Sequence, residues 1–317
     1  MTVLVTGGGG LIGSRIVKRL LARGETAVSL DASEDQPRLD GERDNPKLRR
    51  AAGDIRDGDR LLALMREHAV ERVIHMAAVL VPLTEREPAI GFAVNITGAT
   101  NVFEAARHSG VKRVCYATSM STYGDQAKYG DAHVTEESER YPYSLYGYAK
   151  LINEETAKTY TRNFGLDTRG IRIAMVFGHG RVTGRSSAMS RVISAAAVGE
   201  LAVSDVAAGQ LAPVVYVDDV AECMVRICFA ENLELPVYAG LSTPATLQDA
   251  ADIVRRYIPA ADIRFADDAV SYQTVKKMDG TRLERAIGYR LPPLERRILD
   301  HINEARAERQ MPPLAPT

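Results

Sequence analysis

The first part of the chain alternates short apolar runs with longer segments in which apolar residues recur at helical spacing. Strands that alternate with helices of ten or more residues are typical of βαβ units and a parallel sheet. Crossovers between parallel strands are right-handed, and repeated crossovers build a doubly wound (Rossmann) α/β fold. The apolar runs predict strands at residues 2–6, 26–31, 70–78, 111–119 and 167–178, and the helical spacing predicts helices at 11–23, 57–68, 95–109 and 145–164.

The pattern changes after residue 178, where a polar loop rich in glycine and serine begins. Shorter elements follow, among them a short strand near VVYVDD, and the tail RQMPPLAPT has the composition of a frayed end. We therefore predict two domains. They are a Rossmann domain over residues 1–178, to which 213–232 return, and a smaller α/β substrate-binding domain made of 179–212 and 233–317.

Composition and charge narrow the class of protein. The net charge is −1, which does not indicate a partner nucleic acid or an anionic membrane surface. No apolar run approaches the roughly 18 residues of a membrane span. The first residues lack the basic region and cleavage site of a signal peptide, so we expect a cytoplasmic protein. Its three cysteines lack metal-ligand spacing, which predicts buried reduced thiols.

Four consecutive glycines, Gly7 to Gly10, separate the first strand from the first helix. A flexible linker does not fit between two such elements. Glycine permits unusual backbone angles and close approach of a ligand, and the helix N-terminus offers free N–H groups to a phosphate. With Gly13, the run fits the dinucleotide register Gly8-x-Gly10-x-x-Gly13 and the wider register Gly7-x-x-Gly10-x-x-Gly13. A purely structural tight turn is the alternative.

Asp31 ends the second predicted strand. A carboxylate at this place accepts hydrogen bonds from the ribose hydroxyls of NAD and repels the additional phosphate of NADP. The first basic residue after it is Arg38. The sequence therefore favours NAD, with an ordinary turn residue at the strand end as the alternative.

Tyr146 and Lys150 lie four residues apart on a predicted helix, and hence on one face of it. The pKa of a free tyrosine is about 10, too high for a base near neutrality. A lysine cation about 4 Å away would favour the phenolate by about 4 kcal/mol, which lowers the pKa by about three units. The pair thus suits proton transfer, although a surface pair has the same spacing.

Ser119 lies in CYATSMSTYG, at the end of an apolar strand. Open α/β sheets bind ligands at the carboxyl ends of their strands, so this hydroxyl is placed to bond a reacting oxygen. A polar cap of the strand end is the alternative. Together with Tyr146 and Lys150, Ser119 completes a candidate catalytic set.

Over nearly its whole length the chain resembles the extended short-chain dehydrogenase/reductases, the NAD-dependent epimerase/dehydratase family. The segments that carry the resemblance are TGGGGLIGS, Asp31, GDIRD, HMAA, NITGATNVFEAA, ATSMSTYG, YGYAK, RIAMVFG and YVDDVAE. The resemblance implies a Rossmann fold, NAD as cofactor, no metal, and a homodimer formed through the helices near 95–109 and 145–164.

The family's residue roles carry over to matching positions. Tyr146 would be the acid/base, Lys150 would lower its pKa and hold the ribose, and Ser119 would polarise the substrate. The remaining cofactor-binding residues would be Gly7, Gly10, Leu11, Ile12, Gly13, Asp31, Asp54, Ile55, Ala77, Ala78 and Asn95. The substrate-binding residues would be Val81, Ser121, Thr122, Met175 and Arg185. Asp218 and Asp219 are expected to cap a helix rather than bind a metal.

Departures from the family pattern narrow the expected reaction. Met120 and Ser121 replace the Asp-Glu pair of sugar-nucleotide dehydratases, which argues against water elimination. Met175 replaces an asparagine usual in nucleotide-sugar enzymes, and Pro213 lies near the place of an arginine that grips the diphosphate. Because buried phosphate needs fixed donors, these changes argue against a nucleotide-linked substrate, although Arg181 or Arg185 could substitute.

The expected function is therefore NAD-dependent oxidation of a secondary alcohol, or reduction of the ketone, in a small polar substrate. The candidates are a sugar acid, a sugar, a polyol or a hydroxy amino acid. The alternative is a nucleotide-sugar epimerase, which uses the same chemistry twice without net redox change. A non-catalytic NAD-sensing protein is a third hypothesis, but such proteins typically lose the tyrosine or the lysine.

Overall fold

A computed structural model describes residues 1–316, apart from the side chain of Arg185. Its largest sheet has seven strands, and every strand pair in it is parallel. The strand order is β10 (Val237–Ala239), β6 (Asp167–Ile173), β5 (Arg113–Ser119), β4 (Arg72–His75), β1 (Thr2–Thr6), β2 (Thr26–Asp31) and β3 (Leu48–Ala52). The predicted doubly wound fold is confirmed.

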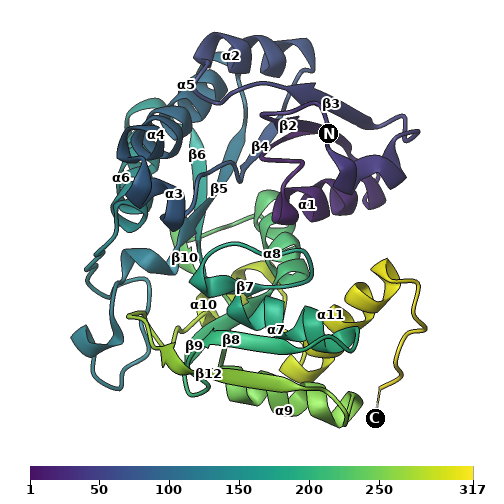
Figure 1. Ribbon diagram of the computed structural model, residues 1–317. Coiled ribbons are helices and arrows are strands. Elements are labelled where there is room, and N and C mark those ends of the chain that lie inside the picture. Colours follow the sequence, from purple (N-terminus) through teal and green to yellow (C-terminus); the bar gives the residue numbers. More distant parts are fainter. Residues whose placement is uncertain (317) are drawn as a thin grey trace.

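Helices cover both faces of this sheet (Figure 1). One face carries α1 (Leu11–Ala22) and α8 (Val217–Phe229), and the other carries α2 (Gly58–Glu67), α5 (Ala99–Ser109) and α6 (Leu145–Phe164). Successive strand residues point to opposite faces. Val3 and Val5 accordingly join the core under α1 and α8, while Leu4 joins the core under the other three helices. Since both faces are covered, the strands read as continuous apolar runs.

The rest of the chain forms a smaller α/β part below the large sheet (Figure 1). It contains a sheet of β11 (Thr243–Ala245), β9 (Ala212–Tyr216) and β7 (Met175–Phe177), and a pair formed by β12 (Ile263–Val270) and β8 (Ala202–Val206). Its helices are α7 (Ala188–Ala197), α9 (Leu247–Tyr257), α10 (Thr281–Ile287) and α11 (Leu294–Glu308). Two short helices, α3 (Val81–Arg86) and α4 (Pro88–Phe92), follow β4.

Three details differ from the sequence-based expectation. The strand predicted over 167–178 is broken at Ala174, so that β6 pairs in the large sheet and β7 pairs with β9 in the small one. The helix predicted from residue 95 begins with a π-helical turn, Ala93–Gly98. The segment 233–317, expected wholly in the smaller domain, contributes β10 to the large sheet, while β9 from 213–232 joins the small one. These pairings depend on partners distant in sequence, which local patterns do not report.

Of the helices within residues 1–316, none combines the length and apolar character needed to cross a bilayer. The three cysteines are buried free thiols, as predicted.

Two fully buried histidines predict sensitivity to acid. His301 lies on α11, bonds Ser194 Oγ at 2.8 Å and stacks on the ring of Phe177, and burial lowers its pKa from 6.5 to about 3. Burial likewise lowers the pKa of His75 to about 3. Unfolding lets both imidazoles bind protons below about pH 6.5, so the free energy of unfolding should be fully retained above that pH and fall towards pH 3. The expected slope is about 1.4 kcal/mol per pH unit for each histidine.

The measurement is urea unfolding between about pH 7.5 and 4.5, which spans the ordinary pKa of histidine. His301→Gln keeps a partner for Ser194 but cannot titrate, so its slope should be shallower than that of the wild-type protein. Equal slopes in the two proteins would contradict the assignment to His301.

Candidate functional site

The glycine run forms a turn between β1 and α1 in which two glycines are required. Gly7 has φ +68°, and a Cβ on it would lie 2.9 Å from Ala77 N. A Cβ on Gly13 would lie only 2.0 Å from Gly7 O, because the first turn of α1 packs directly on the loop. Gly10 is the N-cap of α1 and has no side chain, so the N–H groups of the helix start are left to a ligand. The loop is thus a cradle open to a phosphate.

Asp31 stands beside this cradle at the carboxyl end of β2. Its carboxylate accepts hydrogen bonds from Gly9 N at 2.9 Å and from Ala32 N at 2.8 Å. Both N–H groups fix the carboxylate while its remaining lone pairs can accept from hydroxyls. The acid and the loop therefore fit the ribose and pyrophosphate of a dinucleotide on the same sheet edge.

The other predicted cofactor residues lie along this edge. Ala77 follows β4, and its N–H is 3.3 Å from Thr6 Oγ1. Asn95, in the π-helical turn, bonds both the N–H and the carbonyl of Val79 at 2.9 Å. Asp54, after β3, bonds Arg56, and Ile55 is buried against Gly98. Ala78 follows Ala77, and Leu11 and Ile12 open α1.

The three candidate catalytic residues come together at the carboxyl end of β5. Ser119 is the last residue of β5, and Tyr146 and Lys150 are in the first two turns of α6, which Ser144 caps through Gly147 N at 3.1 Å. The Lys150 ammonium is buried, donates to Ala117 O at 2.8 Å and lies 5.5 Å from the centroid of the Tyr146 ring. Asn153, one turn later, donates to Asn95 O at 2.8 Å and so joins α6 to the π-helical turn.

Burial and neighbouring polar groups act in opposite directions on the pKa of Tyr146. Burial raises the pKa of the phenol, while the Arg181 guanidinium and the Ser119 hydroxyl lower it. Burial lowers the pKa of Lys150 to about 8. Arg181 thus adds positive charge at the phenol, besides the Lys150 ammonium that lies beside its ring. The neutral phenol is a proton donor, and its conversion to a base requires further positive charge nearby.

The predicted substrate residues lie in different environments, some exposed and some buried. Val81 begins α3 and is 40% exposed, and Ser121 lies beside Ser119, whose hydroxyl donates to Ser121 Oγ at 3.1 Å. Thr122 is fully buried and donates to Ser119 O at 2.9 Å, which places it under the site rather than at an open wall. Met175 is nearly buried in β7, with its sulfur 3.1 Å from Tyr272 Oη. The side chain of Arg185 lies outside the described part of the chain.

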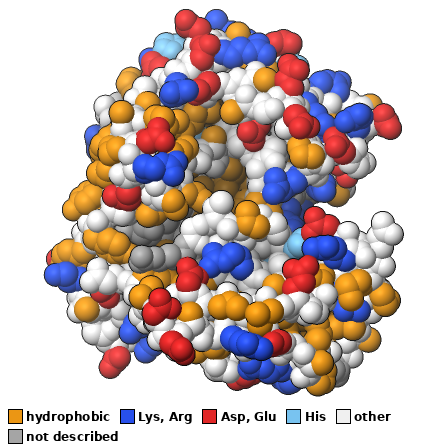
Figure 2. Space-filling view, viewed as in Figure 1, with side chains coloured by type: hydrophobic (Ala, Val, Ile, Leu, Met, Phe, Trp, Pro, Cys, Tyr) orange, Lys and Arg blue, Asp and Glu red, His pale blue; other side chains and the backbone are white. Residues whose placement is uncertain are grey.

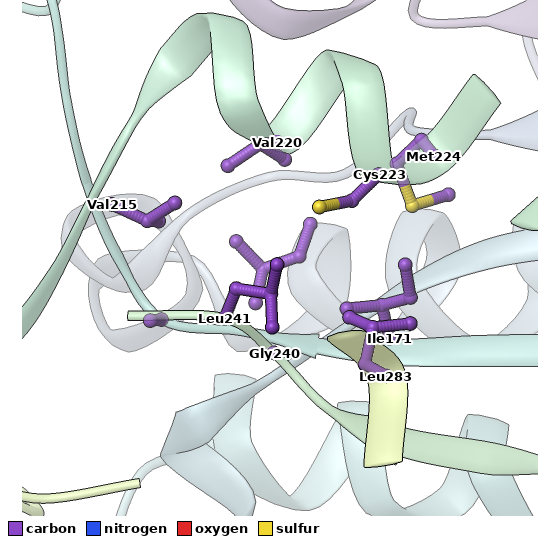
Figure 3. A pocket seen from close by; sticks show the side chains of 10 residues that line it. Ile171, Val215, Val220, Cys223, Met224, Gly240, Leu241 and Leu283 are labelled. Atoms are coloured by element: carbon purple, nitrogen blue, oxygen red, sulfur yellow. The ribbon is translucent and has the colours of Figure 1, made fainter. Parts of the chain in front are cut away.

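Two of the cavities among the described residues differ in the chemistry of their linings. The first is enclosed by apolar side chains between α8 and the ends of β6 and β10, among them Val220, Cys223 and Leu241 (Figure 3). With no polar group to orient a ligand, it belongs to the core. The second is lined by Met175, Ser186, Gln210 and Tyr272 together with apolar residues of α7, β9 and β11. The surface is also hollowed between the Rossmann part and the smaller part (Figure 2).

The prediction that Asp218 and Asp219 cap a helix is wrong, since the N-cap of α8 is Tyr216. Both acids lie in the first turn, where they favour the helix dipole. Asp218 pairs with Arg15 at 2.8 Å, and Asp219 accepts from Arg297 Nε at 3.0 Å. Within the described residues, no three His, Cys, Asp or Glu side chains form a group suited to a metal ion.

Comparison with known proteins identifies the family of this chain. The family model for the NAD dependent epimerase/dehydratase family matches residues 3–235. The chain belongs to this family. The match includes the glycine cradle, Asp31 and all three candidate catalytic residues, so the resemblance seen in the sequence is confirmed.

Relatives within the NAD-dependent epimerase/dehydratase family include both epimerases and dehydrogenases. A UDP-glucose 4-epimerase of Lacticaseibacillus casei is 32% identical over 181 residues, which are 56% of this chain and 52% of that enzyme. The chain thus spans about half the length of this relative. A Staphylococcus aureus protein described as an uncharacterized epimerase/dehydratase is 25% identical over 275 residues, 84% of each chain.

Solved structures agree with the family assignment. A UDP-glucose 4-epimerase of Thermus thermophilus, solved in complex with NAD, has a TM-score of 0.82 and 26% identity, and the match covers 96% of this chain and 99% of that one. An L-threonine dehydrogenase of Cupriavidus necator has a TM-score of 0.85, with the same coverage, but 21% identity, so this likeness concerns the fold alone. Family members of this shape are NAD-dependent epimerases and dehydrogenases.

Arg181 is the site residue that sequence reasoning undervalues. The sequence offers it only as a substitute for a missing diphosphate contact, on a par with Arg185. Its signal in the sequence is weak: a basic residue that follows Gly178 and Gly180, both of which have positive φ. Only the turn that these glycines permit carries Arg181 back towards Tyr146.

Proposed function

We propose that this protein is an NAD-dependent dehydrogenase that interconverts a secondary alcohol and the ketone in a small polar substrate. The observation that carries the proposal is the juxtaposition of Ser119, Tyr146 and Lys150 with the glycine cradle at one edge of the sheet. The candidate substrates are a sugar acid, a sugar, a polyol or a hydroxy amino acid. We propose Tyr146 as the acid/base, Ser119 as the group that bonds the reacting oxygen, and Lys150 as a ribose ligand.

The residues fit NAD as the cofactor. A Cβ would fill the cradle at Gly13, the start of α1 presents free N–H groups, and the Asp31 carboxylate is fixed beside them. When bound, NAD accepts or gives the hydride. Tyr146 takes the hydroxyl proton during oxidation and returns one during reduction, and the Ser119 hydroxyl holds the oxygen that gains or loses it. Lys150 stays oriented by its bond to Ala117 O.

The site composition supports a substrate without a nucleotide. Met175 occupies the place where nucleotide-sugar enzymes usually carry an asparagine, and its sulfur faces Tyr272 Oη. Pro213 lies within β9, which is buried at every position and pairs with β11 at Pro244. These positions therefore offer no hydrogen-bond donors to a diphosphate.

A nucleotide-sugar epimerase is the second candidate. It is supported by the relatives named as UDP-glucose 4-epimerases, at 32% and 26% identity. The two functions differ in net redox change, because an epimerase returns the hydride to the substrate that gave it.

The test is an assay of the purified protein with NAD and, separately, NADP, against free sugars, sugar acids, polyols and threonine. UDP- and GDP-sugars are included and analysed by chromatography. We expect NADH formation with a free hydroxy compound and preference for NAD over NADP, because the Asp31 carboxylate repels a 2′-phosphate. Epimer formation from a nucleotide sugar without NADH accumulation would overturn the dehydrogenase proposal and establish the second candidate.

A homodimer is part of the proposal. The surface over α4 and α6 carries several exposed hydrophobic side chains, and hydrophobic residues gather on that flank (Figure 2). Ile90, Phe92, Tyr148 and Ile152 are 38 to 50% exposed. Burial of such a patch against a second copy would favour association.

A further inference from the structure

Arg181 is half-buried, and the described part of the fold supplies no counter-charge for its guanidinium. Among the described side chains its one hydrogen bond goes to Ser186 Oγ, at 2.7 Å, and its Nε is buried without a partner. By contrast, Arg172 pairs with Glu154 at 2.8 Å and Arg15 with Glu304 at 2.6 Å. Arg72 and Arg140, whose Nε atoms are likewise buried without a partner, at least donate to backbone carbonyls. A buried charge without a partner is costly, which suggests that the partner is a ligand.

The charge lies where a substrate would meet the catalytic phenol. Arg181 follows the turn made by Gly178 and Gly180, with Arg181 N bonded to Gly178 O at 3.3 Å. Its guanidinium interacts electrostatically with the Tyr146 and Tyr272 phenols. Tyr272 and Ser186, the hydrogen-bond partner of Arg181, both line the second cavity. Arg181 therefore bonds a residue of this cavity and also interacts with the catalytic phenol.

The N–H groups of the Arg181 guanidinium indicate which kind of anion would bind to it. The guanidinium has an unpartnered Nε and further N–H groups beside it, and such a fork matches the two oxygens of a carboxylate. Because Arg181 acts on the Tyr146 phenol itself, the anion and the reacting hydroxyl must be close in one small molecule. A nucleotide sugar instead carries its diphosphate across a sugar ring from most of its hydroxyls.

We propose that Arg181 binds the carboxylate of the substrate, so that the substrate is a hydroxy acid and the product the corresponding keto acid. The inference rests on the proposed dehydrogenase function and narrows its substrate list to the acids. The residue is a binding residue: it orients the substrate so that the hydroxyl faces Tyr146 and Ser119.

The first test compares each hydroxy acid with its uncharged amide or polyol, in the wild-type enzyme and in Arg181→Met and Arg181→Lys. We expect Arg181→Met to raise KM for the acid roughly 10- to 100-fold, the value of a charge-assisted hydrogen-bonded pair, with a smaller change for the amide. Arg181→Lys should recover part of the loss, since it keeps charge without the fork. Guanidinium added at millimolar concentration should restore part of the activity of Arg181→Met.

Arg191→Met is the matched control. Arg191 supports the same loop through Ser187 Oγ at 2.6 Å but, unlike Arg181, has a carboxylate partner, Asp205 at 2.6 Å. If both variants lose activity equally with acids and amides, the loop is merely structural and the inference is overturned.

A binding measurement separates this inference from the proposed reaction. The melting temperature of the protein with NADH is measured with hydroxy acids, keto acids, amides or UDP-sugars at about 10 mM, above the usual range of KM. Stabilisation by acids in the wild-type protein but not in Arg181→Met supports the carboxylate site, even if no substrate is turned over. Turnover of hydroxy acids that is indifferent to Arg181→Met overturns it and leaves the dehydrogenase function standing. Stabilisation by UDP-sugars that needs Arg181 also overturns it, since the anion would then be a diphosphate.

Discussion

Replacing Tyr146 with phenylalanine is expected to lower kcat about 100- to 10,000-fold, the contribution of a positioned general acid or base. The phenol oxygen is the group that exchanges the proton with the substrate, and no other hydroxyl of α6 occupies its place beside Ser119. NAD affinity should change little, because the ring remains and the cradle and Asp31 are untouched. Steady-state kinetics and a cofactor titration measure the two effects.

Tyr148→Phe is the matched control. Tyr148 lies two residues further along α6, on a different face of the helix, and is 50% exposed, so the loss of its hydroxyl should leave kcat unchanged. Equal activity of Tyr146→Phe and Tyr148→Phe would exclude the acid/base role of Tyr146 and with it the proposed chemistry.

The same group sets the expected pH dependence. Because burial raises the pKa of Tyr146, the phenolate fraction in the free enzyme rises about tenfold per pH unit through neutrality. Alcohol oxidation needs the phenolate and should accelerate with pH, whereas ketone reduction uses the neutral phenol and should not. In Arg181→Met the rise should move to higher pH, since the guanidinium lowers the phenol pKa.

Gly13→Ala is expected to abolish NAD binding, with a dissociation constant at least about 100-fold higher, the equivalent of about 2.7 kcal/mol. The added Cβ would lie 2.0 Å from Gly7 O, which is backbone and cannot turn away. The turn between β1 and α1 must then open, and the N–H groups of the helix start move from the place of the pyrophosphate. Calorimetric titration of NAD and the melting temperature measure binding and folding separately.

Two further variants keep this prediction testable if Gly13→Ala does not fold. Gly41→Ala, in the short helix after β2, has open space around its Cβ and should behave as the wild-type protein. In Gly10→Ala the Cβ meets only Gly7 O, at 3.1 Å, so the protein should fold while the methyl group obstructs the phosphate. Unchanged NAD affinity in both Gly13→Ala and Gly10→Ala would show that the cofactor does not bind at this turn.

Sequence alone predicted the elements whose cause is local. The strand at residues 2–6 and the helix at 145–164 were predicted at their observed bounds, because apolar periodicity, the Ser144 cap and the Gly165 stop act within a few residues. The glycine cradle was predicted for the same reason: the positive φ of Gly7 and the packing of Gly13 arise inside one turn. Tyr146 and Lys150 share a helix face, so their proximity followed from their spacing.

Tertiary structure alone decided the features that join distant segments. The break at Ala174 exists because β6 and β7 find partners in different sheets, and β10 completes the large sheet from a segment far along the chain. Arg181 acts on Tyr146 from a separate loop, and its missing counter-charge is visible only once the neighbouring side chains are placed. Periodicity reports which face of an element is buried, but not what it is buried against, and electrostatics at the site depends on the latter.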